Sequence, residues 1–125
     1  PASRVVGGFI GSPPMNFIKL EAMDGKVRLG DATLAAPVGN GKVELGLRGE
    51  DAALDTGMGT IPFEVRVVEP MGSHLLLTGS VLSQMVRIVA PPTAKVTAGS
   101  RVGLKVDPAR LTWINSESGR AFARA

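Results

Sequence analysis

The chain has 125 residues, of which 44% are hydrophobic and 20% charged, as expected for one ordinary domain with its own core. It contains no cysteine, which excludes disulfides, thiolate catalysis and cysteine-based zinc sites. The net charge of +3 is not concentrated in any run of lysine or arginine, so charge gives only weak support to a nucleic-acid partner. No stretch approaches the roughly 20 consecutive apolar residues of a membrane span.

The first residues predict a short helix that ends abruptly. Ser3 can cap it, and Gly11 with Pro13 and Pro14 stops it. One face of this helix is apolar: Val5, Val6, Phe9 and Ile10. Because so short a helix does not persist alone in water, we expect it to dock on another surface.

From residue 15 onward, apolar residues alternate with polar ones, which predicts β-strands. The 16 glycines and 9 prolines indicate frequent turns, and Asp24-Gly25 is a typical hairpin turn. About nine short strands are expected, at 16–23, 26–30, 32–37, 42–48, 63–69, 74–81, 84–90, 101–106 and 111–115. Within 63–69, Phe63, Val65 and Val67 should share one face. The nine strands follow one another at a spacing of about 8–12 residues, which favours an all-β barrel or sandwich.

Two segments of the chain resemble each other. "GKVELGLRGEDAAL" (41–54) and "GSRVGLKVDPARL" (99–111) each predict a strand that runs into a single helical turn. The equivalent apolar positions are Val43, Leu45 and Leu47 in the first and Val102, Leu104 and Val106 in the second. A duplicated small barrel explains this pattern, and chance similarity between two alternating strands is the alternative.

The residues that could perform chemistry do not form a recognisable site. The phosphate-binding pattern G-x-x-x-x-G-K-[ST] is absent, so we expect no nucleotide hydrolysis by this chain. His74 is the only histidine, and no serine in a nucleophile-elbow pattern accompanies it. Glu50, Asp51 and Asp55 fit no calcium loop and are best interpreted as a solvated loop. The residues alone therefore predict a non-catalytic module without a metal or cofactor.

Four segments together resemble one family. "RVVGGFIGSPPMNF", "LGLRGED", "VVEPMGS" and "VDPARLTWINSESGRAF" occur in this order, from Arg4 to Phe122. They are similar to the C-terminal regulatory domain, the transport-associated or TOBE domain, of ABC importer ATP-binding subunits. The branch is the one that imports maltose, other sugars and glycerol-3-phosphate. The resemblance implies a small OB-fold-like barrel over residues 13–125, preceded by a helix and linker at 1–12 that come from the ATPase domain.

The resemblance also implies a function for the chain as a dimerisation and regulation module. ATP and Mg²⁺ would bind to an ATPase domain upstream of residue 1, and the parent would be an ABC-type ATPase. Its expected partners are that ATPase domain, a second copy of the subunit, the membrane permeases and, in some members, a regulatory protein. The expected location is the cytoplasmic face of the bacterial inner membrane. The residues expected to contact the ATPase domain are Val5, Val6, Phe9, Ile10, Pro13, Pro14, Met15, Asn16 and Phe17.

The chain departs from the family pattern at two places. Gly49 replaces the proline that usually follows "LGLR", and glycine is expected to loosen the helical turn there. Ile114 and Asn115 replace the usual Phe-Asp pair. Two other classes remain open: a basic barrel that binds single-stranded nucleic acid, and a small oxyanion-binding barrel. The family resemblance itself implies no nucleic-acid partner.

Overall fold

The structure is a computed structural model that describes residues 15–30, 32–55 and 60–116. The helix and linker expected at 1–12 lie outside these residues, as do Pro13 and Pro14. The elements in chain order are β1 (Met15–Ala22), β2 (Lys26–Leu29), β3 (Ala32–Ala35), β4 (Gly41–Arg48), η1 (Gly49–Asp51), β5 (Ala52–Asp55), β6 (Ile61–Pro70), β7 (Leu75–Val81), β8 (Gln84–Ala90), β9 (Arg101–Val106), η2 (Pro108–Arg110) and β10 (Thr112–Asn115).

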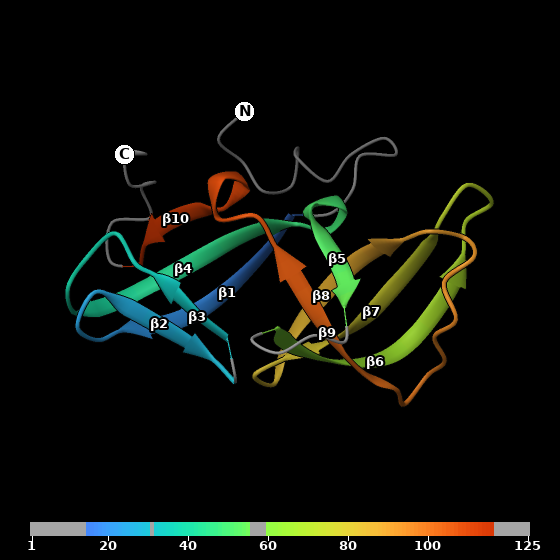
Figure 1. The fold of residues 1–125 in the computed structure, drawn as a ribbon, viewed down its shortest axis with the longest axis horizontal. Coiled ribbons are helices and arrows are strands. Elements are labelled where there is room, and N and C mark those ends of the chain that lie inside the picture. The colour runs from blue at the N-terminus through green and yellow to red at the C-terminus, as the bar shows by residue number, and fades with distance from the viewer. Residues whose placement is uncertain (1–14, 31, 56–59, 117–125) are drawn as a thin grey trace.

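The strands form three antiparallel sheets. Their orders are β1-β4-β10, β2-β3 and β5-β9-β6-β7-β8. The first two sheets lie on one side of the molecule and the five-stranded sheet on the other (Figure 1). The five-stranded sheet curls, so that its two edge strands β5 and β8 approach each other. The expected all-β fold of a small OB-like barrel is therefore confirmed.

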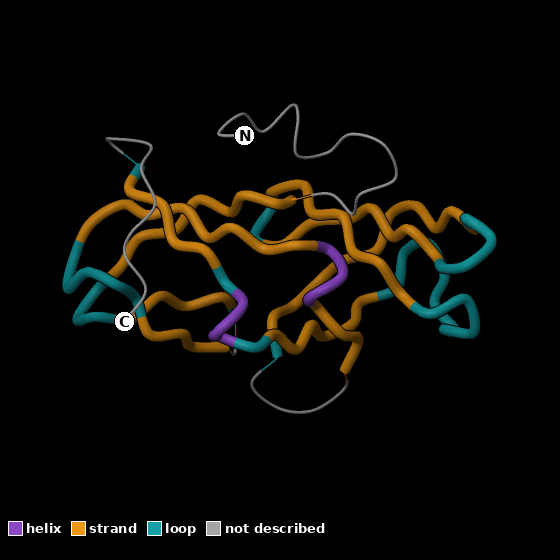
Figure 2. The backbone as a smooth tube through the Cα atoms, turned by 90° about the horizontal axis from the view of Figure 1, so that it is seen from above, coloured by secondary structure: helices purple, strands orange, loops and turns teal. Residues whose placement is uncertain are grey.

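The two sides exchange strands through two short 3₁₀ turns. Strand β4 runs into η1, and the chain then crosses over to form β5, which pairs with β9. Strand β9 runs into η2, and the chain crosses back to form β10, which pairs with β4. The two turns lie next to each other in the middle of the molecule (Figure 2). The two similar segments predicted from the sequence thus form equivalent strand-and-turn units, which supports duplication.

A single apolar core joins both sides. Alternate residues of β1 are buried, including Ile18 and Leu20, and β2 adds Val27 and Leu29. Phe63 on β6 is the largest fully buried side chain. Burying a side chain of this kind stabilises the fold by roughly 1.5–3 kcal/mol, so these alternating residues account for most of the driving force.

Strand β6 differs from the simple alternation expected for it. Phe63 and Val65 are buried as predicted, but Val67 is 46% exposed and Val68 packs against the core. The register with β7 shifts between Val65 and Val67, which marks a β-bulge. Because one extra residue reverses the faces beyond the bulge, the prediction for Val67 was wrong.

Strand β5 was not among the nine expected strands. Its residues follow the acidic turn and had been interpreted as part of a helical turn, although only Gly49–Asp51 are helical. Ala52 to Asp55 pair instead with β9. Four residues rich in alanine carry little strand signal, so the pairing partner decides the structure here.

In the described ranges, no helix is long and apolar enough to cross a membrane.

Candidate functional site

The side chain of Asn16 ties the start of β1 to two other strands of the barrel. This residue is 7% exposed and occupies the inner face of β1, in phase with Ile18. Its Oδ1 accepts a hydrogen bond from the Arg87 amide at 2.8 Å, and its Nδ2 donates to the Arg87 carbonyl at 2.8 Å. Nδ2 also donates to the Leu47 carbonyl at 3.0 Å. The Asn16 amide therefore links β1 to both β4 and β8.

A second side-chain amide, on β8, binds the backbone of β1. Gln84, at the start of β8, accepts from the Lys19 amide through Oε1 at 2.8 Å and donates to the Lys19 carbonyl through Nε2 at 2.8 Å. The two strands run side by side, since Asn16 meets Arg87 and Lys19 meets Gln84. Two side-chain amides thus replace a backbone ladder along the contact between β1 and β8. We call this contact the amide seam.

Gly49, the departure from the family pattern, lies against the same part of β8. It is buried, and a Cβ atom placed on it would come within 2.7 Å of the Arg87 carbonyl oxygen. That distance is shorter than real Cβ contacts allow. Glycine therefore permits the close approach of η1 to β8, a role beyond the loosening expected from the sequence. The Arg87 backbone is therefore hydrogen-bonded by Asn16 and packed closely against η1.

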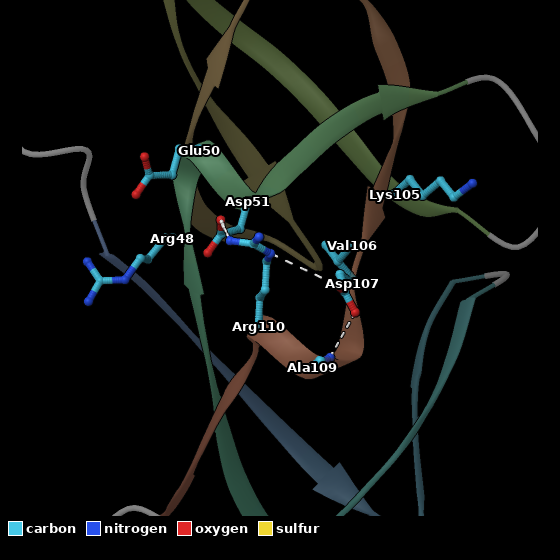
Figure 3. A pocket seen from close by; sticks show the side chains of 8 residues that line it. All are labelled: Arg48, Glu50, Asp51, Lys105, Val106, Asp107, Ala109 and Arg110. Atoms are coloured by element: carbon cyan, nitrogen blue, oxygen red, sulfur yellow. Dashed lines mark hydrogen bonds and ion pairs between the residues drawn. The ribbon is translucent and has the colours of Figure 1, made fainter. Parts of the chain in front are cut away.

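An open polar groove of about 1050 Å³ lies where η1 and η2 meet. Figure 3 shows the eight residues that line it: Arg48, Glu50, Asp51, Lys105, Val106, Asp107, Ala109 and Arg110. Arg110 Nη1 lies 3.6 Å from Asp51 Oδ1, and Arg110 Nε lies 3.9 Å from Asp107 Oδ2. Asp107 also caps η2 by accepting from the Ala109 amide at 3.0 Å. The two turns are therefore joined by an ion-pair triad.

Asp51 and Arg110 occupy equivalent positions in the two similar segments, since each is the last residue of its 3₁₀ turn. Likewise Gly49 and Pro108 are both first residues. The pair therefore connects the two halves where the chain crosses between them. Asp51 is 13% exposed at its side chain and Asp55 belongs to β5, so the interpretation of the whole acidic group as a solvated loop was wrong for these two residues.

The other candidate residues do not come together. His74 is half-buried in the β6–β7 turn, and its Nδ1 lies 3.0 Å from Ser73 Oγ. Within the part of the chain that the structure describes, no group of three or more histidine or acidic residues could hold a metal ion. No arrangement among these residues supports a hydrolytic site.

The predicted interface residues that the structure describes are Met15, Asn16 and Phe17. Met15 and Phe17 are half-buried and lie on the opposite face of β1 from Asn16. The Met15 methyl lies over Gly46, where a Cβ atom would approach it to 2.8 Å. The polar groups of Asn16 are engaged inside the domain. Contact of these residues with an ATPase domain remains a prediction, and Val5, Val6, Phe9, Ile10, Pro13 and Pro14 lie outside the described residues.

Sequence reasoning missed the roles of Arg87 and Gln84. One signal for the seam was present, because Asn16 falls on the apolar face of β1, where a buried amide requires partners.

Residues 45–114 match the family described as the TOBE domain, which is more than half of the chain. The chain belongs to the TOBE-domain family. This match spans β4 to β10 and includes both 3₁₀ turns and the polar groove. It does not favour the nucleic-acid-binding or oxyanion-binding alternatives.

Curated relatives align with nearly all of this TOBE domain. The sn-glycerol-3-phosphate import ATP-binding protein UgpC of Paracoccus denitrificans (strain Pd 1222) is 39% identical over 96% of the chain. The protein of the same name from Jannaschia sp. (strain CCS1) is 34% identical over 96% of the chain. A putative ATP-binding protein of Brucella abortus (strain 2308) is 30% identical over 95%. The chain spans only 35% of the length of each of these relatives.

Proposed function

We propose that this TOBE domain is the non-catalytic C-terminal regulatory domain of the ATP-binding subunit of an ABC importer. The observation that carries the proposal is the alignment of 96–98% of the chain with three proteins named as sn-glycerol-3-phosphate import ATP-binding proteins. The imported solute would be a sugar or a compound like glycerol-3-phosphate. The parent protein would use ATP hydrolysis to drive its uptake.

In this proposal the partners follow from the place of the domain in the parent. An ATPase domain in the same chain would bind ATP and Mg²⁺, and permease subunits would hold the complex at the cytoplasmic face of the membrane. A second copy of the subunit would form the homodimer, and some members of the family also bind a regulatory protein. None of these steps needs a catalytic group from the barrel.

The geometry at the start of β1 supports a mechanical role. Asn16 follows the first strand residue and ties β1 to β8 by two hydrogen bonds of 2.8 Å. Because η1 packs on the same residue of β8, β1 is connected to the crossing turns through Arg87. A displacement applied to the chain before β1 would therefore reach the barrel as a whole instead of bending one strand.

Two experiments test the proposal. Calorimetric titration with Mg²⁺ and ATP should show binding by the full-length protein and none by the 125-residue chain. Micromolar binding by the chain would contradict the assignment.

In a strain that lacks the gene, the full-length protein should restore uptake of radiolabelled glycerol-3-phosphate or of a sugar, and a version without residues 15–116 should not. If the full-length protein restores uptake of none of these solutes, the proposed transport role is refuted.

A further inference from the structure

The turn between β7 and β8 contains a leucine in a backbone conformation that leucine rarely adopts. Leu82 and Ser83 both have positive φ angles, 49° and 65°. The β1–β2 turn has nearly the same angles, 52° at Asp24 and 74° at Gly25. Two-residue hairpin turns of this shape favour asparagine, aspartate and glycine. Asp24-Gly25 follows this preference and Leu82-Ser83 does not, so turn geometry does not explain the leucine.

Core packing does not explain it either. Leu82 is 49% exposed, and Met85, three residues further on, is 68% exposed. Met85 pairs with Ser80 across the hairpin, and Ser80 in turn pairs with Glu64, so these residues share one face of the sheet. Two of the five exposed large hydrophobic side chains in the described ranges therefore belong to this turn and to the strand that leaves it.

The β7–β8 turn is anchored to the neighbouring strand β1. Gln84 directly follows it and makes two hydrogen bonds of 2.8 Å with the Lys19 backbone. A turn fixed in this way loses little conformational freedom on binding, which favours its use as a contact. The position of Leu82 is thus set before any partner arrives.

The charges beside the turn indicate what kind of partner would fit. A shallow groove of about 360 Å³ includes Leu82, Glu64, Arg66 and Arg101 in its lining. Glu64 lies 3.2 Å from Arg66 and 3.5 Å from Arg101, so one carboxylate faces two guanidinium groups. The two guanidinium groups outnumber the one carboxylate, so the surface beside Leu82 carries a net positive charge and favours an acidic partner.

We propose that the β7–β8 turn is a protein-interaction surface, in which Leu82 and Met85 enter an apolar pocket of an acidic partner protein. Arg66 and Arg101 would meet carboxylates at the rim of that pocket. Apolar anchors surrounded by arginine are typical of such contacts. The proposal depends on the exposed residues of this turn and not on the transport function.

The first test concerns the strain at Leu82. The double variant Leu82→Asn with Ser83→Gly should raise the unfolding midpoint of the chain by about 3–6 °C, since it restores residues suited to the turn. Asp24→Leu is the matched control, because it places a leucine in the equivalent turn, and it should lower the midpoint. A double variant that melts at or below the wild-type temperature would show that Leu82 is not held at a cost.

The second test concerns the partner. A photo-cross-linking amino acid at position 82 of the full-length protein, in its own cells, should give a discrete adduct with one acidic protein. The same group at Met23, which is 66% exposed beside the Asp24-Gly25 turn, should not. The purified cross-linked protein is then titrated calorimetrically. The Leu82→Asn/Ser83→Gly variant and the Arg66→Glu/Arg101→Glu variant should each bind at least tenfold more weakly. An adduct only with a second copy, no adduct, or unchanged affinity of the variants would overturn the proposal.

Discussion

Asn16 holds Arg87 through both of its side-chain polar atoms. Oδ1 accepts from the Arg87 amide and Nδ2 donates to the Arg87 carbonyl, each at 2.8 Å. This is the bonding that a neighbouring strand would normally provide. From β8, the Gln84 side chain makes the same pair of hydrogen bonds with the Lys19 backbone on β1. The contact between β1 and β8 therefore depends on two amide side chains.

Asn16→Ala should lower the free energy of unfolding by about 2 kcal/mol, because it removes this partner from the buried Leu47 carbonyl and from the partly buried amide and carbonyl of Arg87. Urea unfolding followed by circular dichroism measures this loss. Asn40→Ala is the control, since Asn40 is exposed and its side chain makes a long 3.4 Å contact with the Asp24 amide. Equal stability of the two variants would contradict the structural role given to Asn16.

Gln84→Ala should have a smaller effect, about 0.5–1 kcal/mol, because its hydrogen bonds lie at the surface and water replaces them. The local consequence is more specific. The Lys19 amide should exchange its hydrogen faster, while the amide of Ile18, the fully buried neighbour on β1, should keep its protection. Unchanged exchange at Lys19 would show that this hydrogen bond does not persist in solution.

Gly49→Ala should destabilise the domain by roughly 1–3 kcal/mol, because the added methyl group meets the Arg87 carbonyl and η1 must move away from β8. Gly39→Ala is a suitable comparison, since no atom lies within 4 Å of its added Cβ. Thermal unfolding of both variants separates the local clash from a general effect of replacing glycine. A stabilising Gly49→Ala substitution would mean that the approach of η1 to β8 is looser than the structure shows.

Most of the fold could be predicted from alternation along the chain. The strand ending at Leu29, for example, buries Val27 and Leu29 as its pattern indicates. The Asp24-Gly25 turn was also predicted, because its residue types match its backbone angles. Strand β5 and the bulge in β6 were missed. Both depend on which strand lies alongside, and periodicity along one segment carries no information about that.

The candidate site was less accessible to prediction. The similarity of residues 41–54 and 99–111 indicated two equivalent units, but not that their turns would meet. The ion pair of Asp51 with Arg110 joins positions that are far apart in sequence. The close approach at Gly49 and the seam at Arg87 are likewise contacts across the barrel. Such contacts follow from how the sheets curl, which the sequence pattern does not specify.

The Asp51–Arg110 pair should contribute little to stability at high salt. Arg110→Gln should cost about 0.5 kcal/mol or less at low ionic strength, because the guanidinium group is 66% exposed. The difference should shrink further in 1 M salt. A double-mutant cycle with Asp51→Asn measures the pair itself. A coupling energy that does not change with salt would contradict the interpretation of this pair as a screened surface contact.

We propose that the stretch from Val5 to Phe17 joins this TOBE domain to an ATPase domain. Hydrogen exchange of that stretch, compared between the 125-residue chain and the full-length protein, tests it most directly. Peptides from the core strands, such as one containing Leu45, serve as the internal reference and should exchange equally in both. We predict markedly slower exchange of residues 5–10 in the full-length protein. Equal, strong protection in a monomeric 125-residue chain and in the full-length protein would contradict the claim.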